Sequence, residues 1–160
     1  LCASPDHTKR HQVLLLAYLR LHPEEASEEY DDGTLPLHHL LQNDPPLKLV
    51  TKLVEAYPES VFVDETIKGY YPLHVACRHG CSVPVVDYLI HRNPQALYKK
   101  SRRFFICCIE EIILLCLGRG LEGWSCEDMV KALPEGNPNR QPLLELLHSH
   151  YMHHPLLEKY

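Results

Sequence analysis

The sequence predicts an all-α solenoid of stacked helix–turn–helix repeats with one inserted apolar helix. Three observations predict this fold. First, the stretch TLPLHHLLQND, which starts at Thr34, has a counterpart 36 residues later, YYPLHVACRHG from Tyr70. Second, both copies carry helix-start and helix-stop residues at the same positions. Third, a later Gly that fits the pattern, Gly123, arrives 18 residues late because an apolar segment precedes it.

The register between the two copies extends over some thirty residues without a gap. A period between 20 and 50 residues is typical of stacked repeats. Chance explains a shared Pro-Leu-His triplet, but it does not explain the whole register, so we interpret the motif as structural rather than catalytic. The motif residues are Gly33, Pro36, Leu37 and His38 in the first copy, and Gly69, Pro72, Leu73, His74, Ala76 and Gly80 in the second.

Each copy is predicted to form two short helices. They span residues 35–43 and 46–56 in the first copy, and 71–79 and 82–92 in the second. Pro36 and Pro72 stand at the first helical position, where the missing N–H costs nothing. Gly80 can end its helix in the left-handed conformation. We expect the core to contain Leu37, Leu49, Leu53, Leu73, Ala76, Val85 and Leu89.

The second helix of each copy is followed by a proline, Pro58 or Pro94, which prevents its continuation. Asn93 can adopt the left-handed conformation there, and Tyr57 would do so less readily. An extended stretch then leads to the next glycine. In the degenerate last unit, Ser125 is predicted to be a helix N-cap.

The predicted organisation has six parts. They are an N-terminal helix or partial capping repeat (1–33), a first repeat (34–69), a second repeat (70–101), an apolar insertion (102–120), a degenerate C-terminal capping repeat (121–151) and a tail (152–160). Terminal repeats are expected to be atypical because their outer faces meet water.

The two copies resemble the ankyrin repeat. The stretches GTLPLH at Gly33 and GYYPLH at Gly69 carry the resemblance, with Ala76 where helices pack. Where the family has Thr before the Pro, this chain has Leu35 and Tyr71. The resemblance implies a non-enzymatic scaffold or adaptor that binds protein partners through its first helices and the fingers between repeats. The residues it places there are His39, Gln42, Asn43, Tyr70, Val75, Arg78 and His79, with Glu65, Thr66, Ile67, Lys68, Lys99 and Lys100.

The apolar insertion RRFFICCIEEIILLCLGR, from Arg102 to Arg119, has three interpretations. One is a helix packed on the repeat stack. The second is a helix that binds a partner or an anionic membrane surface, which would make the chain a membrane-peripheral adaptor acting through Lys99–Leu117. The third is a translated intron. The apolar run is too short for a membrane span and contains two adjacent glutamates.

Composition excludes some classes of function. The net charge of −5 disfavours a general nucleic-acid binder. Seven cysteines without regular spacing predict a reducing compartment, cytoplasmic or nuclear. The sequence has no nucleophile elbow, phosphate-binding loop or metalloprotease motif, so we expect no catalytic residues and no cofactor. The oligomeric state and the identity of the partner stay open.

A Cys/His metal-binding protein is the remaining alternative. The run HVACRHGC offers four zinc-type ligands, His74, Cys77, His79 and Cys81. Against this, His74 is the turn histidine of the repeat, and Cys77 aligns with the core position Leu41. Near the C-terminus, His150 and His154 have the i, i+4 spacing of a helical metal pair. We expect a polar helix end there rather than a metal site.

Overall fold

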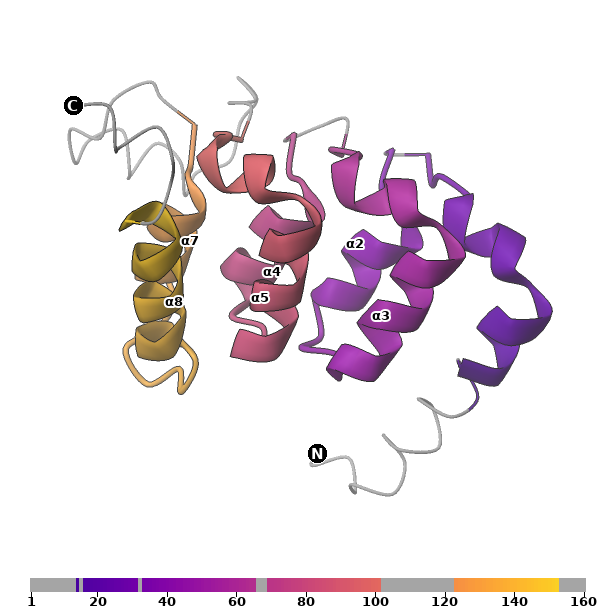
Figure 1. Cartoon of the computed structure of the whole chain (residues 1–160), viewed down its shortest axis with the longest axis horizontal. Coiled ribbons are helices and arrows are strands. Elements are labelled where there is room, and N and C mark those ends of the chain that lie inside the picture. Colours follow the sequence, from indigo (N-terminus) through magenta and orange to yellow (C-terminus); the bar gives the residue numbers. More distant parts are fainter. Residues whose placement is uncertain (1–13, 15, 32, 66–68, 102–122, 153–160) are drawn as a thin grey trace.

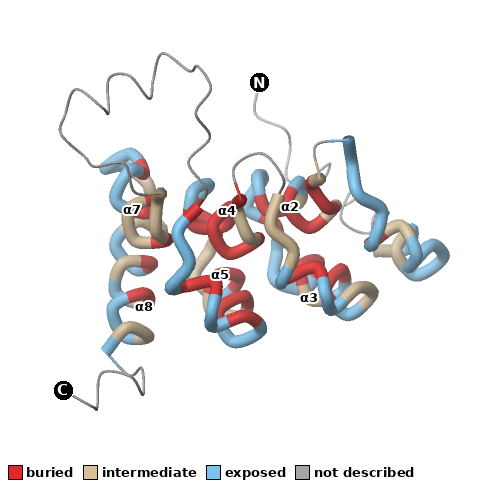
Figure 2. The backbone as a smooth tube through the Cα atoms, turned by 90° about the horizontal axis from the view of Figure 1, so that it is seen from above, coloured by how far each residue is buried: buried red, intermediate tan, exposed pale blue. Residues whose placement is uncertain are grey.

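The helices of the chain lie in two rows, as Figures 1 and 2 show. The computed structural model describes residues 14, 16–31, 33–65, 69–101 and 123–152, and every regular element in these residues is helical. One row contains α2 (Pro36–Leu41), α4 (Pro72–His79) and α7 (Cys126–Lys131). The other contains α3 (Leu47–Ala56), α5 (Val83–Arg92) and α8 (Arg140–Met152). The predicted all-α solenoid of helix–turn–helix units is confirmed.

Turns between the paired helices use the left-handed conformation in both repeats. Gly80 ends α4 with φ 65°, as the sequence predicts. The aligned position in the first repeat is Asp44, with φ 43°. Its carboxylate accepts a hydrogen bond of 2.8 Å from the backbone N–H of Ser82 at the start of α5. Aspartate tolerates the left-handed backbone better than most other residues, and the side chain of Asp44 also joins one repeat to the next.

The prolines after the second helices begin short 3₁₀ helices. These are η1 (Pro23–Ser27), η2 (Pro58–Phe62) and η3 (Pro94–Tyr98), each with proline in its first turn. The predicted extended stretch follows only after these helices, at residues such as Val63 and Lys99. Proline cannot continue the preceding helix, but its fixed φ suits the first position of a new one.

Asn93 does not use the left-handed conformation that is open to asparagine: its φ is −139°, the same as that of Tyr57. The buried side chain instead accepts a hydrogen bond from the backbone N–H of Ala96, at 3.2 Å. Its amide donates to the carbonyl of Val61 in the preceding repeat, at 2.8 Å. Asn93 therefore caps η3 and links the two repeats.

The core lies between the two rows, where Figure 2 shows the buried positions facing each other. All seven residues predicted for the core are buried, none more than 4% exposed. Burial of each large aliphatic side chain contributes roughly 1.5–3 kcal/mol. Because each helix pair packs on the next, this stabilisation is shared between repeats.

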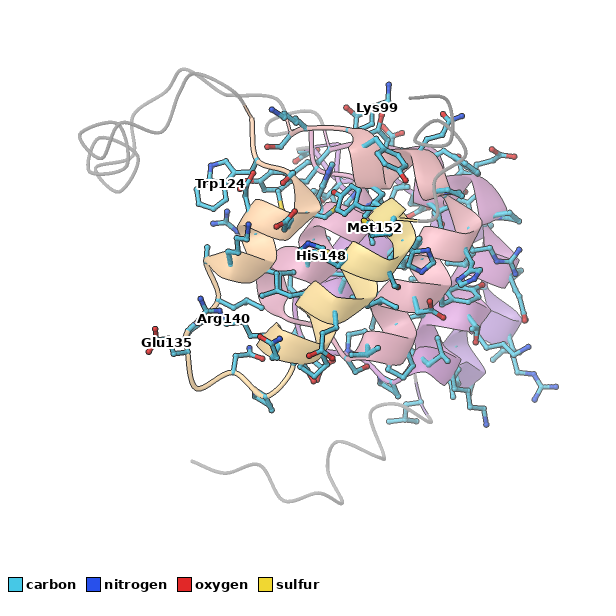
Figure 3. All side chains as sticks on the ribbon, turned by 60° about the vertical axis from the view of Figure 1, so that its left-hand side comes forward. Lys99, Trp124, Glu135, Arg140, His148 and Met152 are labelled. Carbon is cyan, nitrogen blue, oxygen red and sulfur yellow. The ribbon has the colours of Figure 1, made fainter. Side chains whose placement is uncertain are left out.

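The C-terminal cap closes one end of the stack (Figure 1). Ser125 is the N-cap of α7, as predicted: its hydroxyl accepts a hydrogen bond from the Asp128 N–H at 3.2 Å. Helix α8 buries Leu143 and Leu147 completely against the stack. Its other side carries exposed residues such as His148, which Figure 3 labels. At the opposite end, residues 16–21 are helical.

The described residues on either side of the apolar insertion meet at the base of the third finger, the connection between η3 and α7. In the second finger, the Glu65 N–H donates to the Tyr70 carbonyl at 3.1 Å. The Ser101 N–H donates to the Trp124 carbonyl at 3.0 Å in the corresponding way. In chain order, residues 102–122 therefore correspond to residues 66–68 of the second finger. The predicted form of the insertion lies outside the described residues, and so do both of its predicted boundaries, 102 and 120.

Candidate partner-binding surface

The turn histidine of the first repeat holds the base of the second finger. His38 is buried, and its Nδ1 accepts a hydrogen bond of 3.1 Å from the backbone N–H of Leu35. Its Nε2–H donates to the carbonyl of Tyr70 at 3.2 Å. The ring thus satisfies one helix-start N–H and one finger carbonyl. Neither bond needs a side-chain hydroxyl at position 35, so Leu35 in place of Thr does not prevent them.

His74 makes the same two bonds one repeat further on. Its Nδ1 accepts the Tyr71 N–H at 3.2 Å, and its Nε2–H donates to the Lys99 carbonyl at 3.0 Å. The ring is fully buried, and both nitrogens are used by the backbone. These bonds fix where the finger backbones lie, and they support the structural interpretation of the motif.

The first repeat exposes polar groups on α2 and at its end. His39 is exposed, with Nε2 2.8 Å from the Thr34 hydroxyl and its ring edge-on to Tyr30 at 4.6 Å between centroids. Gln42 and Asn43 are exposed at the end of the helix, as predicted. The sequence analysis did not predict Tyr30 as part of this surface. Its position in the first finger, the connection between η1 and α2, could have indicated it.

The second repeat exposes Arg78 and His79 at the end of α4. Arg78 Nη1 donates to the Tyr70 hydroxyl at 3.2 Å, and the guanidinium carbon lies 5.7 Å from the centre of the Tyr70 ring. Tyr70 and Tyr71 are both half-buried against the core. Val75 is only 5% exposed, so its predicted place on the surface is wrong. Helix α4 packs against α2 on one side and α7 on the other, which leaves only its last turn open.

The fingers contribute exposed cations. Lys99 and Lys100 are exposed, while the Lys99 carbonyl is held by His74. Figure 3 labels Lys99 at the same end of the molecule as Trp124. Glu65 is half-buried at the base of the second finger. The predicted finger residues Thr66, Ile67 and Lys68 lie outside the described residues.

The cysteines in the described part of the chain are Cys77, Cys81 and Cys126, and all three are free and buried. The Cys81 thiol donates to the Leu41 carbonyl at 3.0 Å, and burial raises its pKa to about 12. A hydrogen bond from the Cys77 thiol lowers the pKa of Cys126 to about 6. The same contact raises the pKa of Cys77.

The four-ligand run HVACRHGC does not assemble a metal site. Both ring nitrogens of His74 are hydrogen-bonded to the backbone, and the Cys81 thiol donates to the Leu41 carbonyl. His79 is exposed and Cys81 is buried, with the turn residue Gly80 between them in the chain. Among the described residues, the one group of three potential ligands within mutual reach is Asp87, His91 and His150. His154, the predicted partner of His150, lies outside those residues.

One stretch of the chain is similar to a known protein family. Residues 68–98 match the family model of the ankyrin repeat. The match covers the second repeat, from the turn glycine through α4 and α5 to η3. These residues are therefore similar to an ankyrin repeat, and the helix–turn–helix stack is the arrangement expected of such repeats. No curated protein matches the chain.

A membrane-spanning helix is not present in the described ranges, since none of their helices is both long and apolar enough. The alternative of a membrane-peripheral adaptor depends mainly on the insertion after Lys100. Because those residues lie outside the described part of the chain, this alternative stays a prediction.

Proposed function

We propose that the chain is a non-catalytic protein-binding module, an adaptor acting in a reducing compartment. The partner-binding surface comprises the exposed polar ends of the first helices and the adjoining fingers. Its members are His39, Gln42, Asn43, Tyr70, Arg78, His79, Lys99 and Lys100. The observation that carries the proposal is the contact between Arg78 and Tyr70, which joins helix α4 to a finger on a rigid stack.

This contact suits binding for a physical reason. Tyrosine and arginine are the side chains most often responsible for binding energy at protein interfaces. A pair already held in place loses less conformational entropy when a partner arrives. Tyr70 is anchored further, because its carbonyl accepts from His38 and its ring packs on the core.

The charge of the surface favours a partner with acidic side chains. Arg78, Lys99 and Lys100 are all exposed, although the whole chain has a net charge of −5. Local cations steer an acidic partner and determine orientation more than they raise affinity. The proposal therefore predicts salt-sensitive association.

The test begins with capture of a partner under reducing conditions by the immobilised chain and its identification by mass spectrometry. The purified partner is then titrated with K99E/K100E and with R78A. We expect each variant to weaken binding by at least ~10-fold, which corresponds to about 1.4 kcal/mol. The matched control is K48E/K52E, two exposed lysines on α3 with the same change in charge.

Unchanged affinity in both surface variants would show that the partner uses another face. An equal loss of affinity in K48E/K52E would show that the effect comes from the net charge of the chain and not from this surface. Flotation on vesicles with phosphatidylserine distinguishes the membrane alternative: co-flotation that is lost on deletion of residues 102–119 would favour the membrane over a protein partner.

A further inference from the structure

We propose that Asp87, His91 and His150 form a binding site for one Zn²⁺ ion that joins α5 to α8. Asp87 and His91 lie one helical turn apart on α5, and His150 lies in the last turn of α8, which packs against α5. In the described part of the chain, only here do three potential metal ligands bring one atom each within 4.8 Å of the others.

The distances within this cluster suit zinc. His150 Nε2 and His91 Nδ1 lie 3.3 Å and 3.4 Å from the same carboxylate oxygen of Asp87. A tetrahedral zinc ion with bonds of ~2.0–2.1 Å separates its ligand atoms by about 3.3 Å. Two of the three ligand separations thus already match those of a zinc site, and all three lie within 4.8 Å.

The chemistry of the ligands also suits zinc. Two imidazoles and one carboxylate are a common set for three-ligand zinc sites, in which water occupies the fourth position. Among the described residues, the ion-pair partners of Asp87 are both histidines. The nearby Arg92 is instead turned to Tyr88: its Nε donates to the Tyr88 hydroxyl at 3.2 Å. Within the described residues, the Asp87 carboxylate is therefore not paired with a lysine or an arginine.

The two imidazoles are already gathered at this place. The His91 and His150 rings lie edge-on, with 5.5 Å between centroids. His91 Nδ1 also lies 2.8 Å from the main-chain oxygen of Asp87, which keeps the ring beside the carboxylate. That contact is a hydrogen bond donated by Nδ1–H, so the His91 ring must release the main-chain oxygen or present Nε2 in order to bind the ion. The His91 side chain is 65% exposed and that of His150 only 28%, so His91 is the ring with room to turn.

Zinc at this position would stabilise the C-terminal cap. Helix α8 is the last element of the stack, and α5 belongs to the preceding repeat. An ion held by both helices binds the folded chain and not the unfolded one, so it raises the stability of the docked cap. The site shares no residue with the run HVACRHGC or with the proposed partner-binding surface.

The test is a titration of the full chain, without a histidine tag, with Zn²⁺ alone in a non-chelating reductant. We expect one ion bound per chain and a melting temperature raised by about 5–10 °C at ~100 times the Kd. Asp87→Asn, His91→Ala and His150→Ala should each weaken binding by at least ~10-fold and, at the same Zn²⁺ concentration, reduce the thermal shift to about half or less. The control is His148→Ala, an exposed histidine on the same helix outside the cluster.

Three results would overturn the proposal. The first is the absence of Zn²⁺ binding by the wild-type chain. The second is wild-type affinity in His91→Ala and Asp87→Asn, because an ion held only by the terminal histidines needs neither residue. The third is a thiolate-to-metal charge-transfer band in the Co²⁺-substituted chain, which indicates cysteine ligands. If His150→Ala fails to fold, the two α5 variants, both at partly open positions, still decide the question.

Discussion

At His74, one side chain satisfies two backbone groups that belong to different elements. The N–H of Tyr71 begins α4, and the carbonyl of Lys99 lies at the base of the next finger. Neither is satisfied inside a helix, and a buried ring nitrogen replaces the water that each would otherwise require. A histidine that resembles a catalytic residue in the sequence thus acts as a structural bridge.

Replacing His74 with alanine should lower the free energy of unfolding by about 2–4 kcal/mol, because two hydrogen bonds are lost and a cavity is left. Urea denaturation followed by circular dichroism measures the change. The control, His148→Ala, is exposed and should remain within about 0.5 kcal/mol of wild type. A similar small effect for both variants would contradict the bridging role.

Cys81 should resist alkylation in the folded chain. Burial raises its pKa to about 12, so at pH 8 the reactive thiolate is only about one part in ten thousand. We expect iodoacetamide to leave Cys81 unmodified in native protein and to modify it in urea, as read by peptide mass spectrometry. Rapid native labelling would show that the thiol opens to water.

Among the elements, the third finger is closed by backbone contact at its base. The Trp124 N–H donates to the Ser101 hydroxyl at 2.9 Å, in addition to the backbone bond between the same two residues. Gly123 lies so close to the Ser101 backbone that an added Cβ would be 1.7 Å from the Ser101 carbonyl oxygen. No side chain can be accommodated unless the backbone moves.

Gly123→Ala should therefore lower stability by more than about 2 kcal/mol, because the pairing at the finger base must open. Gly136→Ala is the matched control, since nothing lies within 4 Å of its added Cβ, and its effect should stay within about 0.5 kcal/mol. Thermal and urea denaturation measure both. If the two variants were equally stable, Gly123 would have room for a side chain, and the close contact with Ser101 would be contradicted.

Over the whole molecule, stability is distributed along the stack through links between neighbouring repeats. Asp44 bonds to Ser82, Asn93 to Val61, and Asn139 to the Gly80 carbonyl at 2.8 Å. Each link crosses from one unit to the next, and the core is continuous beside them. Because no unit buries its apolar face alone, the stack is expected to unfold as one cooperative whole.

The finger geometry predicts that the chain folds without its insertion. Residues 102–122 should be replaceable by Thr-Ile-Lys, the residues that close the second finger between Glu65 and Gly69. The base is already paired at Ser101 and Trp124, and a shorter loop costs less entropy to close. We expect helical circular dichroism and a single unfolding transition with a midpoint no lower than that of the wild type. A molten, non-cooperative product would show that the insertion is part of the core.

Much of this protein could be predicted from its sequence by periodicity and local chemistry. Gly80, Pro72 and Ser125 act through conformation and capping within a few residues, so their roles were readable in advance. The core positions could be predicted from helical spacing, because each helix buries the face that it turns toward the other row. These features depend on short-range constraints, which a repeat displays twice.

Only the tertiary structure decided the features that depend on neighbours. Val75 looked exposed by its position in the repeat but is buried, because α4 has helices on both sides. Asn93 looked like a left-handed cap, yet it reaches across to Val61. Asp87 and His150 lie 63 residues apart in the chain and meet only because α8 docks on α5. Contacts between units depend on how the units stack, and no local pattern in the sequence records that geometry.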